Sequence, residues 1–166
     1  MKRKLFLVCL LALIIGASCK KDTKEISHNF FCKLNGKKWY PNTNGDWKLK
    51  EAEAHLTDNG SSLFIKAANR KSLEDIGIAI YTPNVKIVVG TYSLNNIQTP
   101  FGYYDKNEFK GEYRTQAGYE GVLEIIKIDK TTKRISGRFY FNAYNDTTSD
   151  NVSITEGEFN LEYYDF

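Results

Sequence analysis

Apolar and polar positions alternate along most of the chain from residue 29 onward. Apolar residues occupy every second position from Ala52 to Leu56 and again from Ile76 to Ile80. A period of two turns one side of a segment towards a core and the other towards solvent, which is typical of a half-buried β-strand. No stretch combines a helical period with helix caps. The pattern therefore predicts a domain built almost entirely of strands.

Turn signals separate these segments. Asn35-Gly36 is the clearest, because this dipeptide favours the positive φ angles of a two-residue hairpin turn. Together the segments predict an all-β fold, an antiparallel β-sandwich or barrel of about nine or ten short strands. The strands expected in the second half of the domain are Lys86 to Val89, Thr91 to Leu94, Gly121 to Ile128, Arg134 to Tyr144, Val152 to Thr155 and Glu158 to Tyr164.

Three residues have specific structural expectations. Cys32 alternates with apolar neighbours on one strand face and is expected to be a small buried hydrophobe. Trp39 is expected to plug one end of the core. Gly157 separates two inward-facing sets of residues, which suits a β-bulge or a sharp bend.

The first residues form a different kind of segment. Basic residues 2–4 precede an apolar run from Leu5 to Ile15, small residues follow at 16–18, and then comes Cys19. The run is shorter than the roughly 20 residues that span a bilayer, so a cleaved secretory signal is expected. The segment resembles a bacterial lipoprotein signal, which implies cleavage before Cys19 and acylation of its sulfur. An ordinary signal cut near Ser18 is the alternative.

This interpretation divides the chain into three parts. Residues 1–18 are a signal peptide that is removed, residues 19–28 are the acylated cysteine and a polar tether, and residues 29–166 are a single β-domain. The tether lets the domain stand roughly 25 Å from the membrane. Lys20 stands where proteobacterial inner-membrane retention would use Asp, so we expect a cell-envelope protein anchored in the outer membrane, on its periplasmic or surface face.

Charge argues against nucleic acid as a partner. The whole chain has 23 Lys and Arg against 20 Asp and Glu, but residues 2–4 leave with the signal, so the mature chain has 20 of each. A chain without a basic stripe lacks the electrostatic footprint of a nucleic-acid-binding protein.

No catalytic or metal-binding pattern stands out, and no cofactor is expected. His28 and His55, the only histidines, lie far apart, and no Cys-x-x-Cys pair is present. Metal sites and a nucleophile elbow are therefore not predicted. Paired carboxylates for glycoside hydrolysis would have to be drawn from Glu112, Glu120, Glu124, Glu156 and Glu158.

Aromatic residues supply the candidate binding surface. Tyr140 and Tyr144 fall on the outward side of the expected strand Arg134 to Tyr144, and Tyr103 and Tyr104 lie in an aromatic-rich stretch. Exposed tyrosines offer flat contact area for sugars or proteins, although tyrosine also fills β-rich cores. Asp146-Thr147-Thr148 resembles a Bacteroidota O-glycosylation acceptor, with Thr147 as the modified residue.

The mature chain resembles a domain-of-unknown-function family of small lipoproteins from Bacteroidota. The resemblance rests on the order of four stretches: Phe31 to Trp39 (FCKLNGKKW), Gly90 to Leu94 (GTYSL), Ile135 to Phe141 (ISGRFYF) and Ile154 to Phe159 (ITEGEF). It implies an envelope lipoprotein with an all-β domain and supplies no activity.

Three functions remain open from the sequence. The first is a non-catalytic module that binds a glycan or an envelope protein. The second is a lipocalin-like carrier that encloses a small apolar ligand. The third is an unrecognised hydrolase, which would need carboxylates that converge in a cleft.

Overall fold

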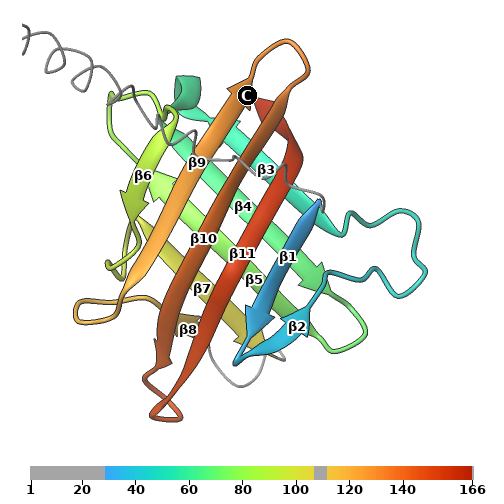
Figure 1. Ribbon diagram of the computed structural model, residues 1–166, viewed down its shortest axis with the longest axis vertical. Helices are drawn as coiled ribbons and strands as arrows, with labels where there is room; N and C mark the ends of the chain where they lie inside the picture. The colour runs from blue at the N-terminus through green and yellow to red at the C-terminus, as the bar shows by residue number, and fades with distance from the viewer. Residues whose placement is uncertain (1–28, 107–111, 166) are drawn as a thin grey trace, which may run out of the picture.

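The computed structural model describes residues 29–106 and 112–165, and these residues form an eleven-stranded sheet with one short 3-10 turn, η1 (Asp58–Gly60) (Figure 1). The all-β prediction is confirmed. The strands are β1 (Phe30–Leu34), β2 (Lys37–Trp39), β3 (Ala52–Thr57), β4 (Ser62–Asn69), β5 (Glu74–Tyr81), β6 (Gly90–Ser93), β7 (Phe101–Lys106), β8 (Glu112–Arg114), β9 (Gly121–Asp129), β10 (Arg134–Asn145) and β11 (Asp150–Asp165). Among the described residues, no helix has the length and apolar character needed to cross a membrane.

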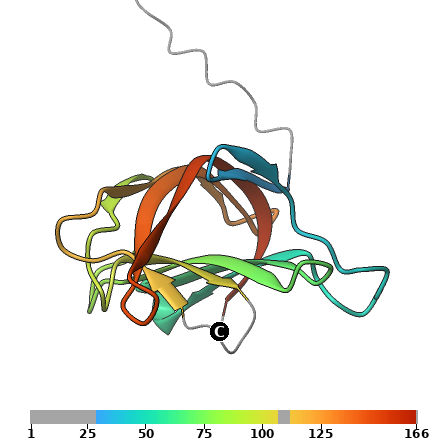
Figure 2. The same cartoon turned by 90° about the horizontal axis from the view of Figure 1, so that it is seen from below.

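The sheet closes on itself. Its strand order is β2-β1-β11-β3-β4-β5-β7-β8-β10-β9-β6, and β10 also pairs with β11, which joins the two halves into a ring. Seen from below in Figure 2, β10 and β11 curve over β4, β5 and β7. Of the two expected architectures, this closed sheet is the barrel. All pairs are antiparallel except β11 with β3, which run parallel.

The two longest strands each change partner along one edge. β11 pairs with β1 between Ile154 and Phe159 and then with β3 from Tyr163 onward. β10 pairs with β9 as far as Phe141 and then with β8 at Tyr144. Each of these two strands is longer than its neighbours and pairs with two of them in turn along one edge. The ring itself runs β11-β3-β4-β5-β7-β8-β10, and the pairs β1-β2 and β9-β6 extend the sheet beside β11 and β10.

Side chains fill the interior of the ring. Aromatic rings lie directly over glycines: Phe141 over Gly102, Phe139 over Gly157, and Phe159 over Gly137. Without a Cβ, each glycine lets a ring approach the sheet closely. The largest fully buried side chains are Phe141, Phe159, Leu63, Ile65, Ile76, Ile78, Ile80, Leu94, Leu123, Ile125, Ile135 and Ile154.

One end of this core is closed by a hydrogen-bonded carboxylate. Glu74 accepts hydrogen bonds from the Trp39 indole at 3.0 Å, the Tyr104 hydroxyl at 2.9 Å and the Ser72 hydroxyl at 2.7 Å. Trp39 is buried, as predicted for a plug of the core. Cys32 is fully buried nearby, and burial, helped by the charge of Glu74, holds the pKa of its thiol well above the ordinary value.

Several strand boundaries differ from those predicted. The two strands expected near the C-terminus form the single strand β11, interrupted by a register shift opposite Tyr140. At this bulge Glu156 has φ 51°, and Gly157 follows it, close to the predicted position. The strand expected from Lys86 to Val89 does not form, and only β6 is found in that region.

Candidate functional site

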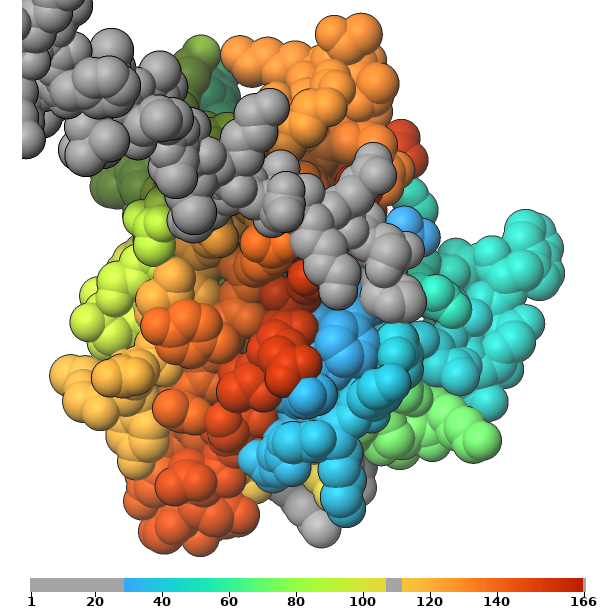
Figure 3. All heavy atoms as spheres, viewed as in Figure 1, coloured from blue at the N-terminus to red at the C-terminus, as the bar shows by residue number. Residues whose placement is uncertain are grey.

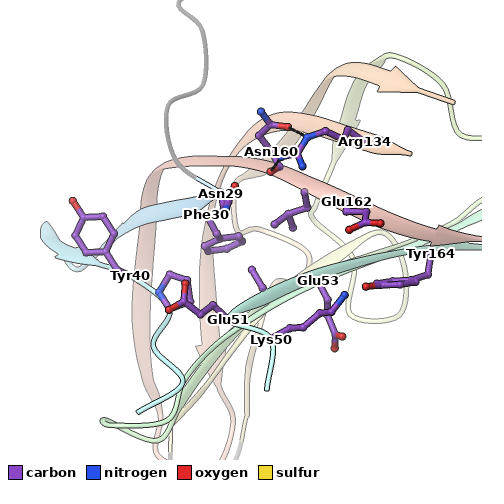
Figure 4. A pocket seen from close by; sticks show the side chains of 13 residues that line it. Asn29, Phe30, Tyr40, Lys50, Glu51, Glu53, Arg134, Asn160, Glu162 and Tyr164 are labelled. Atoms are coloured by element: carbon purple, nitrogen blue, oxygen red, sulfur yellow. Dashed lines mark hydrogen bonds between the residues drawn. The ribbon is translucent and has the colours of Figure 1, made fainter. Parts of the chain in front are cut away.

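A cleft opens where β11 leaves one partner and joins the next. Asn160 still donates its backbone N–H to Asn29 at 2.9 Å, while Tyr163 already pairs with Ala54. Between these points β1 and β3 diverge and leave a cleft of about 460 Å³ (Figure 4). Its lining residues are Asn29, Phe30, Tyr40, Pro41, Lys50, Glu51, Ala52, Glu53, Arg134, Asn160, Leu161, Glu162 and Tyr164.

Two tyrosines from distant parts of the chain lie at this cleft. Tyr40 follows β2, packs its ring against Phe31 at 5.0 Å between centroids and remains 42% exposed. Tyr164 lies near the end of β11, and the Lys50 ammonium lies over its ring, 4.2 Å from the ring centre. The His55 ring lies 5.5 Å from the Tyr164 ring. Figure 4 shows Tyr40 and Tyr164 on opposite sides of the cleft.

Arg134 is held in place at the wall formed by β10 and β11. Its Nε donates to the Asn160 side chain at 3.0 Å, and its Nη2 donates to the Asn160 carbonyl at 2.6 Å. Because both contacts fix the planar guanidinium, Arg134 presents a positioned cation rather than a freely moving one.

Carboxylates dominate the charge of the lining. The lining contains three carboxylates, Glu51, Glu53 and Glu162, and two cations, Lys50 and Arg134. The His55 Nε2 lies 3.4 Å from a Glu53 oxygen. Glu51 and Glu162 are exposed. Solvated carboxylates of this kind accept hydrogen bonds from hydroxyl or amino groups of a ligand.

At the second place where a long strand changes partner, buried side chains of the described residues lie between the two partners. Between β9 and β8, the fully buried Leu94 and Thr115 fill the space beside Phe141. Leu94 donates its N–H to Gly121 at 2.7 Å, and Thr115 donates its N–H to Gly102 at 3.0 Å.

The tyrosines predicted as a binding surface divide into two groups. Tyr140 is 42% exposed on β10, and Tyr144 is half-buried, with its ring 5.8 Å from that of Tyr119. Both lie on the outer face of the sheet, as expected. Neither lines the cleft.

The prediction that Tyr103 and Tyr104 are surface residues is wrong. Successive strand residues point to opposite faces, so the two could not share one surface. Tyr104 points into the core and reaches Glu74. Tyr103 lies flat across Gly77 and stacks near Phe64, which leaves it 9% exposed.

The other predicted chemistry is dispersed. Glu156 pairs with Lys33, and Glu158 approaches Arg138. Within residues 29–106 and 112–165, no three His, Cys, Asp or Glu residues come together as a metal site.

Thr147 lies exposed in the turn between β10 and β11, where its N–H donates to the Asn145 side chain at 2.8 Å. Cys19 and His28 lie outside the described residues.

Sequence reasoning missed the cleft because its walls come from separate segments. Tyr40, Lys50 and Tyr164 were each part of an ordinary strand end or loop, and no motif links them. One signal was available. The stretch from residue 41 to residue 51 opens with turn residues and is longer than the other connections of the first half, which marked a place where two strands do not form a tight hairpin.

Comparison with known proteins places the chain among domains without an assigned role. No curated protein and no solved structure shows a significant match. The family described as a domain of unknown function, DUF6252, matches residues 41–161, which is more than half of the chain and runs from the loop before β3 into β11. The chain therefore belongs to the DUF6252 family, in agreement with the resemblance of its sequence to a family without known activity.

Proposed function

We propose that the mature protein is a non-catalytic binding module, held at the cell envelope by a lipid on Cys19, and that the cleft beside β11 is its binding site. The observation that carries this proposal is the combination of a filled interior with an open, polar cleft. The cleft offers a ligand a concave polar surface. Concavity with converging polar groups is the usual form of a binding site.

The lining favours a glycan. The exposed ring of Tyr40 suits stacking on the apolar face of a sugar, and the carboxylates of Glu51 and Glu162 suit the acceptance of hydrogen bonds from its hydroxyl groups. Carboxylates outnumber cations in the lining, so a neutral glycan fits better than an acidic one.

The same observations favour a binding module over the two alternatives. A lipocalin-like carrier needs an empty chamber, whereas aromatic rings here pack onto the glycines of the sheet. A hydrolase gains some support because Glu51, Glu53 and Glu162 share a cleft. However, Glu51 and Glu162 are exposed, whereas the reacting groups of an enzyme site are enclosed when the site closes and expels water.

The experiment is a binding screen of the mature chain against neutral and acidic oligosaccharides, followed by titration of the best ligand. Tyr40→Ala is compared with Tyr140→Ala, because both tyrosines are 42% exposed and only Tyr40 lines the cleft. We expect Tyr40→Ala to weaken binding by about tenfold or more, equivalent to about 1.4 kcal/mol. Tyr140→Ala should leave the affinity unchanged.

Three other results of this experiment would contradict the proposed glycan site. Loss of binding with Tyr140→Ala alone would place the site on the outer face of β10. Release of a shortened sugar during the titration, abolished by Glu51→Gln or Glu162→Gln, would identify the hydrolase. Equal binding by all variants would contradict a role for the cleft.

A further inference from the structure

The loop between β2 and β3 exposes more apolar surface than a solvated loop requires. Trp47 is 86% exposed, and Leu49 in the same loop is 44% exposed. With Tyr40 at the start of the loop, these residues form what we call the Trp47 loop, residues 40–50. It stands out from the body of the molecule in Figures 1 and 3 (the cyan segment). Exposed aromatic and apolar residues that lie together on one loop indicate a contact surface.

The Trp47 loop adjoins the point where the described domain begins. Asn29 lines the cleft together with both ends of the loop, Tyr40 and Lys50. Cys19 lies ten residues before Asn29 in the chain. Even fully extended, that connection reaches about 35 Å. A domain that is anchored through Cys19 therefore keeps the surface around Asn29, including the Trp47 loop, within reach of the membrane.

The chemistry of the loop suits the headgroup layer of a bilayer. Tryptophan and tyrosine concentrate at this depth, because one part of the ring is apolar and another forms hydrogen bonds. Lys48 lies over the Trp47 ring at 5.6 Å, and Lys50 is exposed two residues further on. Lys37 and Lys38 are exposed on the adjoining β2. The loop also holds one carboxylate, Asp46, so its two lysines leave it with a net positive charge. Lysines beside an aromatic anchor are attracted to anionic headgroups.

We infer that the Trp47 loop docks onto the membrane that carries the lipid anchor, with Trp47 and Leu49 in the headgroup layer. This inference rests on the anchoring part of the proposed function. It adds an orientation: the cleft, which shares Tyr40 and Lys50 with the loop, then opens close to the membrane surface. The lipid holds the protein, and the loop holds it in one orientation.

The two tryptophans of the chain make the inference measurable. Trp39 is buried at 5% exposure, so the fluorescence that responds to the surroundings comes from Trp47. The experiment uses the acylated protein in vesicles that contain anionic phospholipid, compared with the unacylated Cys19→Ser chain in solution. Subtraction of the Trp47→Phe signal isolates Trp47. We expect its emission to shift to shorter wavelength in vesicles and its quenching by acrylamide to fall several-fold.

A control reporter on another surface excludes a general effect of the vesicles. Val88, in the loop before β6, is 59% exposed, and Figure 1 shows β6 on the opposite side of the molecule from the Trp47 loop. In the double variant Trp47→Phe, Val88→Trp, the new tryptophan should remain as accessible to acrylamide in vesicles as in solution.

The possible outcomes separate this inference from the proposed function. Phase separation with a mild detergent shows first whether the wild-type protein carries lipid and Cys19→Ser does not. A protein that stays in the aqueous phase overturns both the anchor and the docking. A protein that enters the detergent phase, but whose Trp47 is as accessible in vesicles as in solution, overturns the docking alone.

Discussion

At the scale of single residues, the core depends on glycines that lie beneath aromatic rings. A Cβ built on Gly102 would lie 2.6 Å from the Phe141 ring, and one on Gly157 would lie 2.6 Å from the Phe139 ring. Such distances are shorter than van der Waals contact, so any side chain there must displace the ring or the strand. These glycines are therefore packing residues, not loop residues.

Gly102→Ala should lower the free energy of unfolding by about 1–3 kcal/mol, because the added methyl overpacks the space beneath Phe141. Urea unfolding of the mature chain measures this. Phe141→Leu removes the ring, so adding Gly102→Ala to that variant should cost clearly less than in the wild-type protein. Equal costs in both backgrounds would contradict the contact.

The burial of Tyr103 has a consequence for stability at alkaline pH. The pKa of Tyr103 is raised well above its ordinary value, and burial is the largest cause. The charges of Asp75, Glu112 and Asp105 raise it further, and the charge of Arg114 partly opposes them. A raised pKa favours the protonated phenol in the folded state. The contribution of Tyr103 to the free energy of unfolding is therefore fully present below the unfolded pKa of about 10 and is lost as the pH rises above that value.

Tyr103→Phe should accordingly make the decline in stability above about pH 10 less steep. Unfolding free energies measured by urea between about pH 8 and pH 11 test this. Identical slopes for the wild-type protein and Tyr103→Phe would show that the pKa of Tyr103 is not raised in the folded protein.

At the scale of elements, Asn35 extends the pairing of the first hairpin with the last strand into the hairpin turn. Asn35 has φ 47° in the turn between β1 and β2. Its N–H donates to the Ser153 carbonyl at 2.8 Å, and its side-chain oxygen accepts the Ser153 N–H at 2.8 Å. The turn residue therefore imitates one further strand pair between β1 and β11.

Asn35→Ala should destabilise the protein by about 1–2 kcal/mol, because alanine both disfavours positive φ and removes the acceptor for Ser153. Asn44→Ala is the matched control, since Asn44 also has positive φ but lies in the exposed loop after β2. We expect a smaller loss for Asn44→Ala in the same urea titration. If the two losses were equal, the hydrogen bond to Ser153 would contribute nothing.

At the scale of the whole molecule, the closure of the sheet creates the candidate site. β11 must pair with β10, β1 and β3, and its pairing with β3 joins residues that are more than 100 positions apart in the chain. Contacts of such long range form only when most of the chain is in place. The cleft, which lies beside this last pairing, is therefore complete only in the closed molecule.

The sequence alone determined the local features. The all-β class, the Asn35-Gly36 turn, the bulge near Gly157 and the burial of Cys32 and Trp39 follow from the period of two and from turn chemistry. These signals act between residues that are close in the chain, so they can be recognised without knowing which strands are neighbours.

The tertiary structure decided which strands meet and what lies between them. It paired β3 with β11 in parallel, closed the sheet between β10 and β11, laid Tyr103 across Gly77, and brought Tyr40 and Tyr164 to one cleft. Each of these depends on the strand beside a residue and on the size of the side chain opposite. That information lies in pairings between distant segments, which alternation along a single segment does not encode.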